Sequence, residues 1–121
     1  MAWSVAFHTS FEDEFDELEQ DMQDEILALM GLLQEFGPKL ARPHVDTLNG
    51  SKHANLKELR FKAADGVWRV AFAFDPQRKA ILLVAGDKSG GSQRKFYRDL
   101  IAKADARWDE HLAELKPQKR R

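Results

Sequence analysis

The chain has 121 residues, of which 43% are hydrophobic and 32% charged, a balance typical of one globular domain with a single core. It has no cysteine, which excludes disulfides, thiolate metal sites and a cysteine nucleophile. The formal net charge of −1 hides an asymmetry, because residues 1–38 hold ten acids and no lysine or arginine, whereas all 19 bases follow. This division indicates either a basic surface that faces a polyanion or a solvated acidic helix packed on a basic sheet.

The sequence gives no signal for export or membrane insertion. The first ten residues lack the basic segment of a signal peptide. No apolar run approaches the roughly 20 residues that span a bilayer. We therefore expect a cytoplasmic protein without a membrane partner.

The N-terminal third predicts a strand and a helical hairpin. Residues 2–8 alternate apolar with small or polar side chains, as strands do. Thr9 and Glu12 form the pattern of a capping box, so we expect the first helix to begin there. Apolar residues then recur at helical spacing until Gly37 and Pro38 end the pattern. A single helix is possible, but two helices with a bend near residues 20–24 pack more compactly and are preferred.

The remainder of the chain predicts three strands and a final helix. A polar connection over residues 38–55 is long enough to wrap around the molecule. Strands follow at 56–61, 66–74 and 80–85, with turns at 65–66 and 75–76 and a glycine-rich loop at 86–92. An amphipathic pattern predicts a helix over 94–115. Because strands and helices are grouped separately, we expect an α+β fold with a mainly antiparallel sheet, as one domain of residues 1–116 with a basic tail of 117–121.

The cations on these strands are the most informative feature of the sequence. Arg69 alternates onto a strand face of otherwise small residues, which leaves a shallow surface. Strand parity lets Glu58 and Arg60 share that surface, and Lys88 follows the last strand. Such cations can hold a phosphodiester and stabilise a phosphorane transition state. RNA cleavage by its own 2′-hydroxyl would need no metal, with Glu58 as the nearby candidate base because arginine stays protonated.

A plain structural interpretation stays open for each of these residues. Arg60 and Glu58 can form an ordinary charge pair on a strand, and Lys88 in a glycine-rich loop is exposed in either case. Tyr97 falls on the apolar stripe of the last helix, which favours core packing over a role in chemistry. The four histidines are not spaced as metal ligands, so we expect no metal site.

The chain resembles a known family in the order of four segments, L-N-G-S-K, N-L-K-E-L-R-F, G-V-W-R-V-A-F-A-F and I-L-L-V-A-G-D-K-S, followed by an amphipathic helix. From about Trp3 to Leu115 it resembles the HigB branch of the RelE/ParE toxin superfamily, which resembles phage-derived proteins. The resemblance implies a RelE-like fold and the toxin of a type II toxin–antitoxin pair. Such toxins are endoribonucleases that cut messenger RNA in the ribosomal A site without a cofactor. A HigA-like helix-turn-helix antitoxin neutralises them, and operator DNA is contacted only through the toxin–antitoxin complex.

The resemblance also implies residue roles. Arg69 would contact the scissile phosphate, and Arg60 and Lys88 complete the catalytic cations. We further expect RNA binding at Lys57, Lys62, Arg94, Lys95 and Tyr97, of which Tyr97 loosely matches an aromatic group used by some members of the family. Two departures stand out, because Asp87-Lys88 replaces an adjacent basic pair and Glu58 lies near the position of a RelE-type lysine. Relatives of the ParE type share the fold but act on DNA gyrase, so a non-nuclease toxin of the same fold is the alternative.

Overall fold

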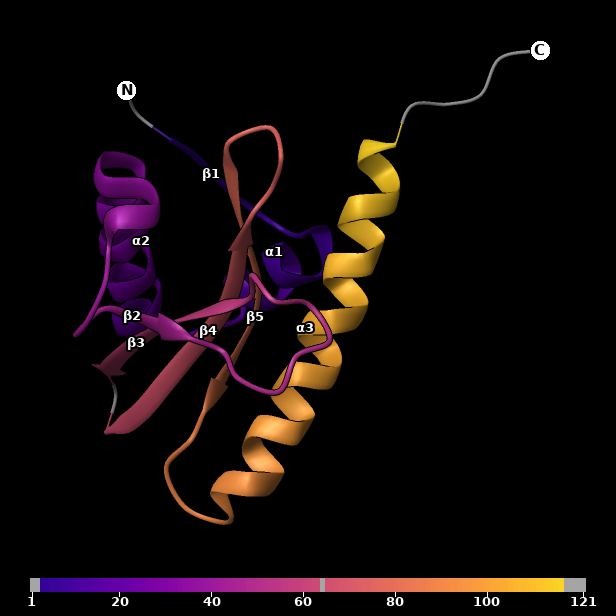
Figure 1. Ribbon diagram of the computed structural model, residues 1–121. Coiled ribbons are helices and arrows are strands. Elements are labelled where there is room, and N and C mark those ends of the chain that lie inside the picture. The colour runs from indigo at the N-terminus through magenta and orange to yellow at the C-terminus, as the bar shows by residue number, and fades with distance from the viewer. Residues whose placement is uncertain (1–2, 64, 117–121) are drawn as a thin grey trace.

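The computed structural model describes residues 3–63 and 65–116, which form a five-stranded sheet between two layers of helices (Figure 1). The strands are β1 (Ser4–Phe7), β2 (Val45–Thr47), β3 (Lys57–Ala63), β4 (Gly66–Phe74) and β5 (Lys79–Asp87). The helices are α1 (Thr9–Asp16), α2 (Gln20–Phe36), the 3-10 helix η1 (Gly37–Lys39) and α3 (Gln93–Leu115). The strand order is β1-β5-β4-β3-β2, and β1 pairs with β5 in parallel while the other pairs are antiparallel. The expected α+β class with a mainly antiparallel sheet is confirmed.

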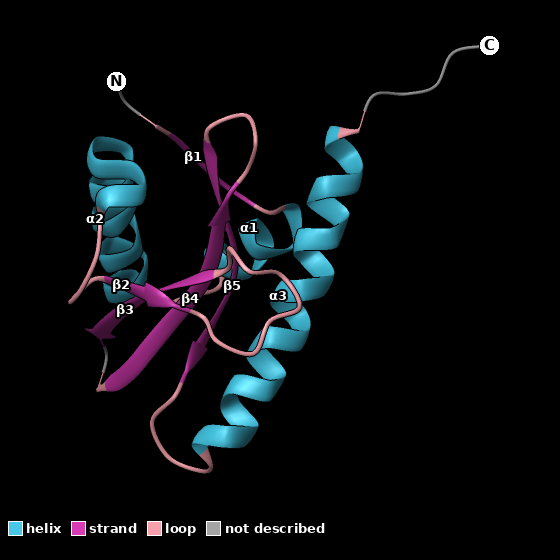
Figure 2. Ribbon diagram, in the orientation of Figure 1, coloured by secondary structure: helices cyan, strands magenta, loops and turns pink. Residues whose placement is uncertain are grey.

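The two faces of the sheet carry different cores, and Figure 2 shows α2 and α3 on opposite sides. On one face α1 and α2 pack on large strand residues that include Leu59, Val70, Phe72 and Leu82. On the other face α3 packs on smaller or aliphatic residues that include Ala71, Ala73, Ile81 and Leu83. Because α3 lies mainly over β5 and β4, polar side chains of β3 on this face border open space. This asymmetry positions the candidate site.

The N-terminal elements match the expectation except at two boundaries. The N-cap of α1 is His8, whose Nδ1 accepts a hydrogen bond from the Ser10 N–H at 3.0 Å, and Thr9 is already helical. The predicted Thr9–Glu12 capping box is therefore wrong, because an imidazole nitrogen supplies the acceptor instead. The preferred two helices are confirmed, but the break lies at residues 17–19, before the predicted 20–24. Across this break the Gln23 side chain of α2 donates to the carbonyl of Phe15 of α1 at 2.9 Å.

The connection over residues 38–55 is not wholly irregular, since it contributes η1 and the edge strand β2. Three residues are too few to give an alternating pattern, so the sequence offers no signal for β2. β5 also runs to Asp87, two residues past the predicted end. The Asp87 carboxylate accepts hydrogen bonds from the Val67 and Ser89 N–H groups, which fixes the start of the following loop.

None of the described helices is long and apolar enough to span a bilayer. The basic tail expected at residues 117–121 lies outside the described part of the chain.

The end of α2 gives a test of the fold with an internal control. Gly37 has φ +55°, and an added Cβ would overlap the indole ring of Trp3. We expect Gly37→Ala to lower the free energy of unfolding by about 3 kcal/mol in urea titrations, through backbone strain and overpacking. Gly31 lies within the same helix with open space around it, so Gly31→Ala should raise the free energy of unfolding by about 0.5–1 kcal/mol. Equal effects of the two substitutions would contradict this packing.

Candidate active site

Two arginines face each other across neighbouring strands on the side of the sheet that carries α3. The antiparallel register pairs Arg60 of β3 with Arg69 of β4, and Glu58 with Ala71. The three charged side chains therefore share one face, because residues two apart on a strand point the same way. Like charges directly opposite each other are unfavourable unless anions lie nearby. In the structure the carboxylates of Glu58 and Asp46 lie near these arginines.

The hydroxyl of Tyr97, from the first turns of α3, links the buried charges. It donates to Oε1 of Glu58 at 2.9 Å and accepts from Nε of Arg69 at 3.2 Å. Arg69 Nη1 also donates to the Trp68 carbonyl at 2.9 Å, and its Nε lies 3.7 Å from Glu58 Oε1. Arg69 and Glu58 are each only 5% exposed. The expectation that Tyr97 serves core packing is therefore incomplete, since its ring packs against the core while its hydroxyl belongs to the site.

A hollow opens beside these groups and is lined by Glu58, Tyr97, Arg60, Lys88 and Asp46, among others. We call it the Glu58 hollow. The Arg60 side chain is 31% exposed, with Nε 3.9 Å from Glu58 and Nη1 3.6 Å from Asp46. The Lys88 ammonium lies 5.7 Å from the centre of the Tyr97 ring. The hollow thus offers accessible cations next to a partly desolvated carboxylate.

The surroundings shift the proton affinities of three of these groups. Burial raises the pKa of Glu58 above its usual range, although the Tyr97 hydrogen bond and the arginines oppose this. Burial lowers the pKa of Lys88, and the charges of Arg69 and Arg60 lower it further. Burial also raises the pKa of Tyr97, so its phenol stays neutral and acts as a hydrogen-bond donor. The pKa values of the Glu58 carboxylate and the Lys88 ammonium are thereby both shifted toward neutral pH, as in many acid–base pairs.

The other predicted RNA-binding residues do not all lie near this hollow. Lys62 is two residues beyond Arg60 on the same face. Lys57 has the opposite parity and is paired with Phe72, so it belongs to the face covered by α2. Arg94 and Lys95 lie exposed in the first turn of α3, where Lys95 pairs with Asp99 at 2.7 Å.

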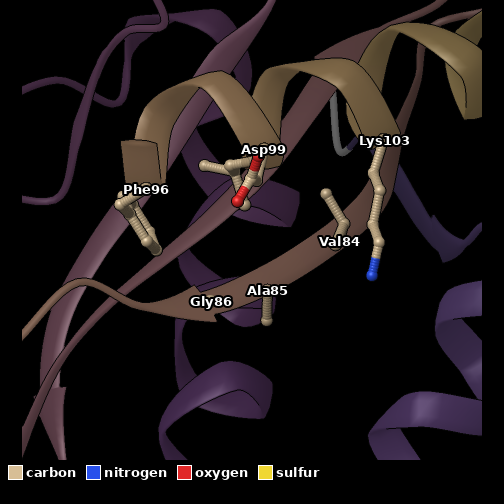
Figure 3. Close-up of a pocket in the computed structure, with 7 residues that line it drawn as sticks. Val84, Ala85, Gly86, Phe96, Asp99 and Lys103 are labelled. Atoms are coloured by element: carbon tan, nitrogen blue, oxygen red, sulfur yellow. The ribbon is translucent and has the colours of Figure 1, made fainter. Parts of the chain in front are cut away.

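A separate pocket lies between β5 and α3 and contains none of the predicted site residues (Figure 3). The side chains of Phe96 and Lys103 point from α3 toward the strand in this view. Phe96 covers Gly86 so closely that an added Cβ there would lie 2.8 Å from its ring. This pocket therefore reflects how α3 seats on β5.

Sequence reasoning missed Asp46 and Arg42. Asp46 lies on β2, and its carboxylate pairs with Arg42 at 2.7 Å. No motif marks either residue, and the strand that positions Asp46 is too short to be recognised from its pattern. A search for acids near the predicted arginines in sequence would not have reached residue 46.

The fold defines the structural class of the protein. It aligns with a solved structure of the E. coli toxin RelE, an arginine-to-alanine double mutant in the free state, with a TM-score of 0.64. The alignment covers 88% of this chain and 98% of that one at 12% sequence identity. The expected RelE-like fold is confirmed.

Sequence comparisons identify the family. Residues 13–109 match the model of the phage-derived Gp49-like proteins. The chain is 43% identical over 99 residues to "Putative toxin HigB3" of Mycobacterium tuberculosis H37Rv, covering 82% of this chain and 84% of that relative. It is 41% identical over 108 residues to "Putative toxin HigB2" of the same strain, covering 86% of this chain. There the chain spans about half of the relative's length, namely 53%. The chain belongs to the Gp49-like family, and the HigB resemblance is confirmed.

The Tyr97 hydroxyl gives a prediction about stability. Tyr97→Phe leaves the Nε of buried Arg69 without its acceptor, so we expect a loss of about 1–3 kcal/mol in the free energy of unfolding. The control is Lys95→Gln, which breaks an exposed ion pair on the same helix and should cost no more than about 0.5 kcal/mol. Urea titration at neutral pH measures both. A Tyr97→Phe protein as stable as the control would show that the hydroxyl is not needed to hold the site.

Proposed function

We propose that this protein is the toxin of a type II toxin–antitoxin pair and that it cleaves messenger RNA on the ribosome in the cytoplasm. One observation carries the proposal: an opposed pair of arginines shares its surface with a buried carboxylate, a phenol and a lysine. Relatives named as HigB toxins support the class. By family, its partners are a HigA-like helix-turn-helix antitoxin and the ribosome with its messenger RNA, and operator DNA is reached only through the antitoxin.

The cations would bind the scissile phosphate. Arg60 and Lys88 reach it from the open side of the Glu58 hollow. Arg69 is buried and does not line this hollow, so it would act on the phosphorane through its fixed charge as negative charge develops. Tyr97 keeps Arg69 and Glu58 in place without itself losing a proton.

Acid–base catalysis would use the two groups whose pKa values are shifted toward neutral pH, Glu58 and Lys88. Glu58 accepts the proton of the 2′-hydroxyl while the 2′-oxygen attacks phosphorus. The bond from phosphorus to the 5′-oxygen breaks, and Lys88 donates a proton to that leaving oxygen. The products are a 2′,3′-cyclic phosphate and a 5′-hydroxyl end. Each step uses groups of this chain and of the RNA, so the proposal includes no metal or cofactor.

The first test is induced expression of the chain alone, followed by mapping of transcript ends. Arg69→Ala should abolish growth inhibition and the internal cuts, because it removes a charge at the developing phosphorane. Since Arg69 is buried, Arg60→Gln serves as a second variant, with circular dichroism to check folding. The control is Lys39→Gln, which removes an exposed cation on η1 and should arrest growth like the wild type. Folded Arg69→Ala protein that arrests growth at the wild-type dose would refute its role. Intact transcripts from the wild type would favour the gyrase-directed alternative.

The acid–base assignment predicts the pH dependence of cleavage on programmed ribosomes. Glu58 must be deprotonated, so the single-turnover rate should fall as pH falls through its pKa, which lies above the ordinary 4.5. Lys88 must be protonated, so the rate should fall as pH rises through its pKa, which in the free protein lies below the ordinary 10.5. Lys88→Arg keeps the charge but not the proton donation, and should lower the rate roughly 100-fold and remove the alkaline limb. Wild-type rates in Lys88→Arg would leave Lys88 a purely electrostatic role.

A further inference from the structure

A second hollow shares Arg60 with the Glu58 hollow. It lies where β2 begins, since the Arg60 N–H donates to the His44 carbonyl and β3 then runs on to Ala63 paired only with β4. Its lining combines four cations with an apolar wall, namely Arg42, Arg60, Lys62 and Arg69 with Pro43, Phe61 and Val67. The two hollows are therefore neighbours on the surface, with Arg60 in the lining of both.

The second hollow carries a surplus of positive charge. Among the described residues no carboxylate lines it. Asp46 reaches two of its cations from outside, Arg42 at 2.7 Å and Arg60 at 3.6 Å. Glu58 lies 3.9 Å from Arg60 and 3.7 Å from Arg69. Two carboxylates against four cations leave a surplus of two positive charges, and the single negative charge of a phosphodiester would offset one of them.

Arg42 lines this hollow although its side chain is 74% exposed. Its Nη2 donates to Oδ2 of Asp46, which also faces Arg60. Hydrogen bonds from the Thr47 backbone N–H and from Arg42 hold the pKa of Asp46 below its usual range, so the carboxylate stays ionised. Asp46 therefore acts as a fixed counter-ion that keeps the two guanidinium groups side by side.

We propose that the second hollow binds the phosphate of the nucleotide next to the cleaved linkage, with Arg42 as a phosphate ligand. The inference rests on the proposed function, because an RNA strand held in the Glu58 hollow must continue past Arg60. Pro43 and Phe61 add an apolar surface against which a sugar or base can pack. The ligand class is single-stranded ribonucleotide with two consecutive phosphates.

The test compares two uncleavable 2′-O-methyl oligonucleotides, a dinucleotide with one phosphate and a trinucleotide with two. Fluorescence anisotropy or NMR titration gives both dissociation constants. The wild type should bind the trinucleotide roughly tenfold more tightly, the gain expected for charge-assisted hydrogen bonds to a phosphate. Arg42→Gln should reduce this ratio to about threefold or less, and the salt slope for the trinucleotide should fall by about 1. Lys39→Gln, which removes a cation outside both hollows, should keep the wild-type ratio.

Three outcomes would overturn the inference. One is a wild type that binds neither oligonucleotide or binds both equally well. Another is an unchanged ratio in Arg42→Gln. The third is an equal loss of affinity for both oligonucleotides in that variant, which would mean that Arg42 acts on the Glu58 hollow through Asp46 and Arg60. Failure of the proposed function would instead appear as uncut transcripts in the expression experiment, whatever the binding ratio.

Discussion

The hydroxyl of Tyr97 is the contact on which the site depends, because it joins α3 to two strands at their buried charges. A guanidinium and a carboxylate that are only 5% exposed are costly to bury unless their hydrogen bonds are satisfied. The Trp68 carbonyl accepts one hydrogen bond from Arg69, and Tyr97 supplies one hydrogen bond to each of the two groups with a single oxygen. The position of that oxygen is set by apolar packing, since Leu100 and Ala104 seat the helix on alanines of β4. The chemistry of the site therefore rests on the small side chains of a neighbouring core.

The far half of α3 is fixed by polar contacts to separate parts of the chain. Arg107 forms a bidentate pair with Glu14 of α1 and donates to the carbonyl of Leu83 on β5. Consecutive residues 109–111 then reach three connecting segments through the pairs His53–Asp109, His8–Glu110 and His111–Asp75. Three of the four histidines are thus paired with carboxylates. A helix held in this way along its length keeps its first turns, and hence Tyr97, in register with the sheet.

The sequence was sufficient to place the charged residues of β3 and β4 on one face of the sheet, but not to identify the side chains that contact them. Strand periodicity of two placed Glu58, Arg60 and Arg69 on one face, and the register bears this out. Helical periodicity could assign Tyr97 to the buried side of α3 but could not say what its hydroxyl meets, because that depends on how far the helix slides along the sheet. Asp46 was out of reach, since β2 exists only through pairing with β3. The His8 cap was missed for a similar reason, as an imidazole acceptor is not part of the usual capping pattern.

The opposed arginines explain why this surface should prefer an anion at all. Two guanidinium groups in direct cross-strand register repel each other, and the free protein offsets this with Glu58 and Asp46. Glu58 is an imperfect counter-ion, because burial raises its pKa and so disfavours the negatively charged form of the carboxylate. A phosphate at Arg60 would supply the missing negative charge and would raise the pKa of Lys88 beside it. Part of the binding energy would then come from relief of the repulsion between Arg60 and Arg69. Lys88 would stay protonated until it donates its proton to the leaving oxygen.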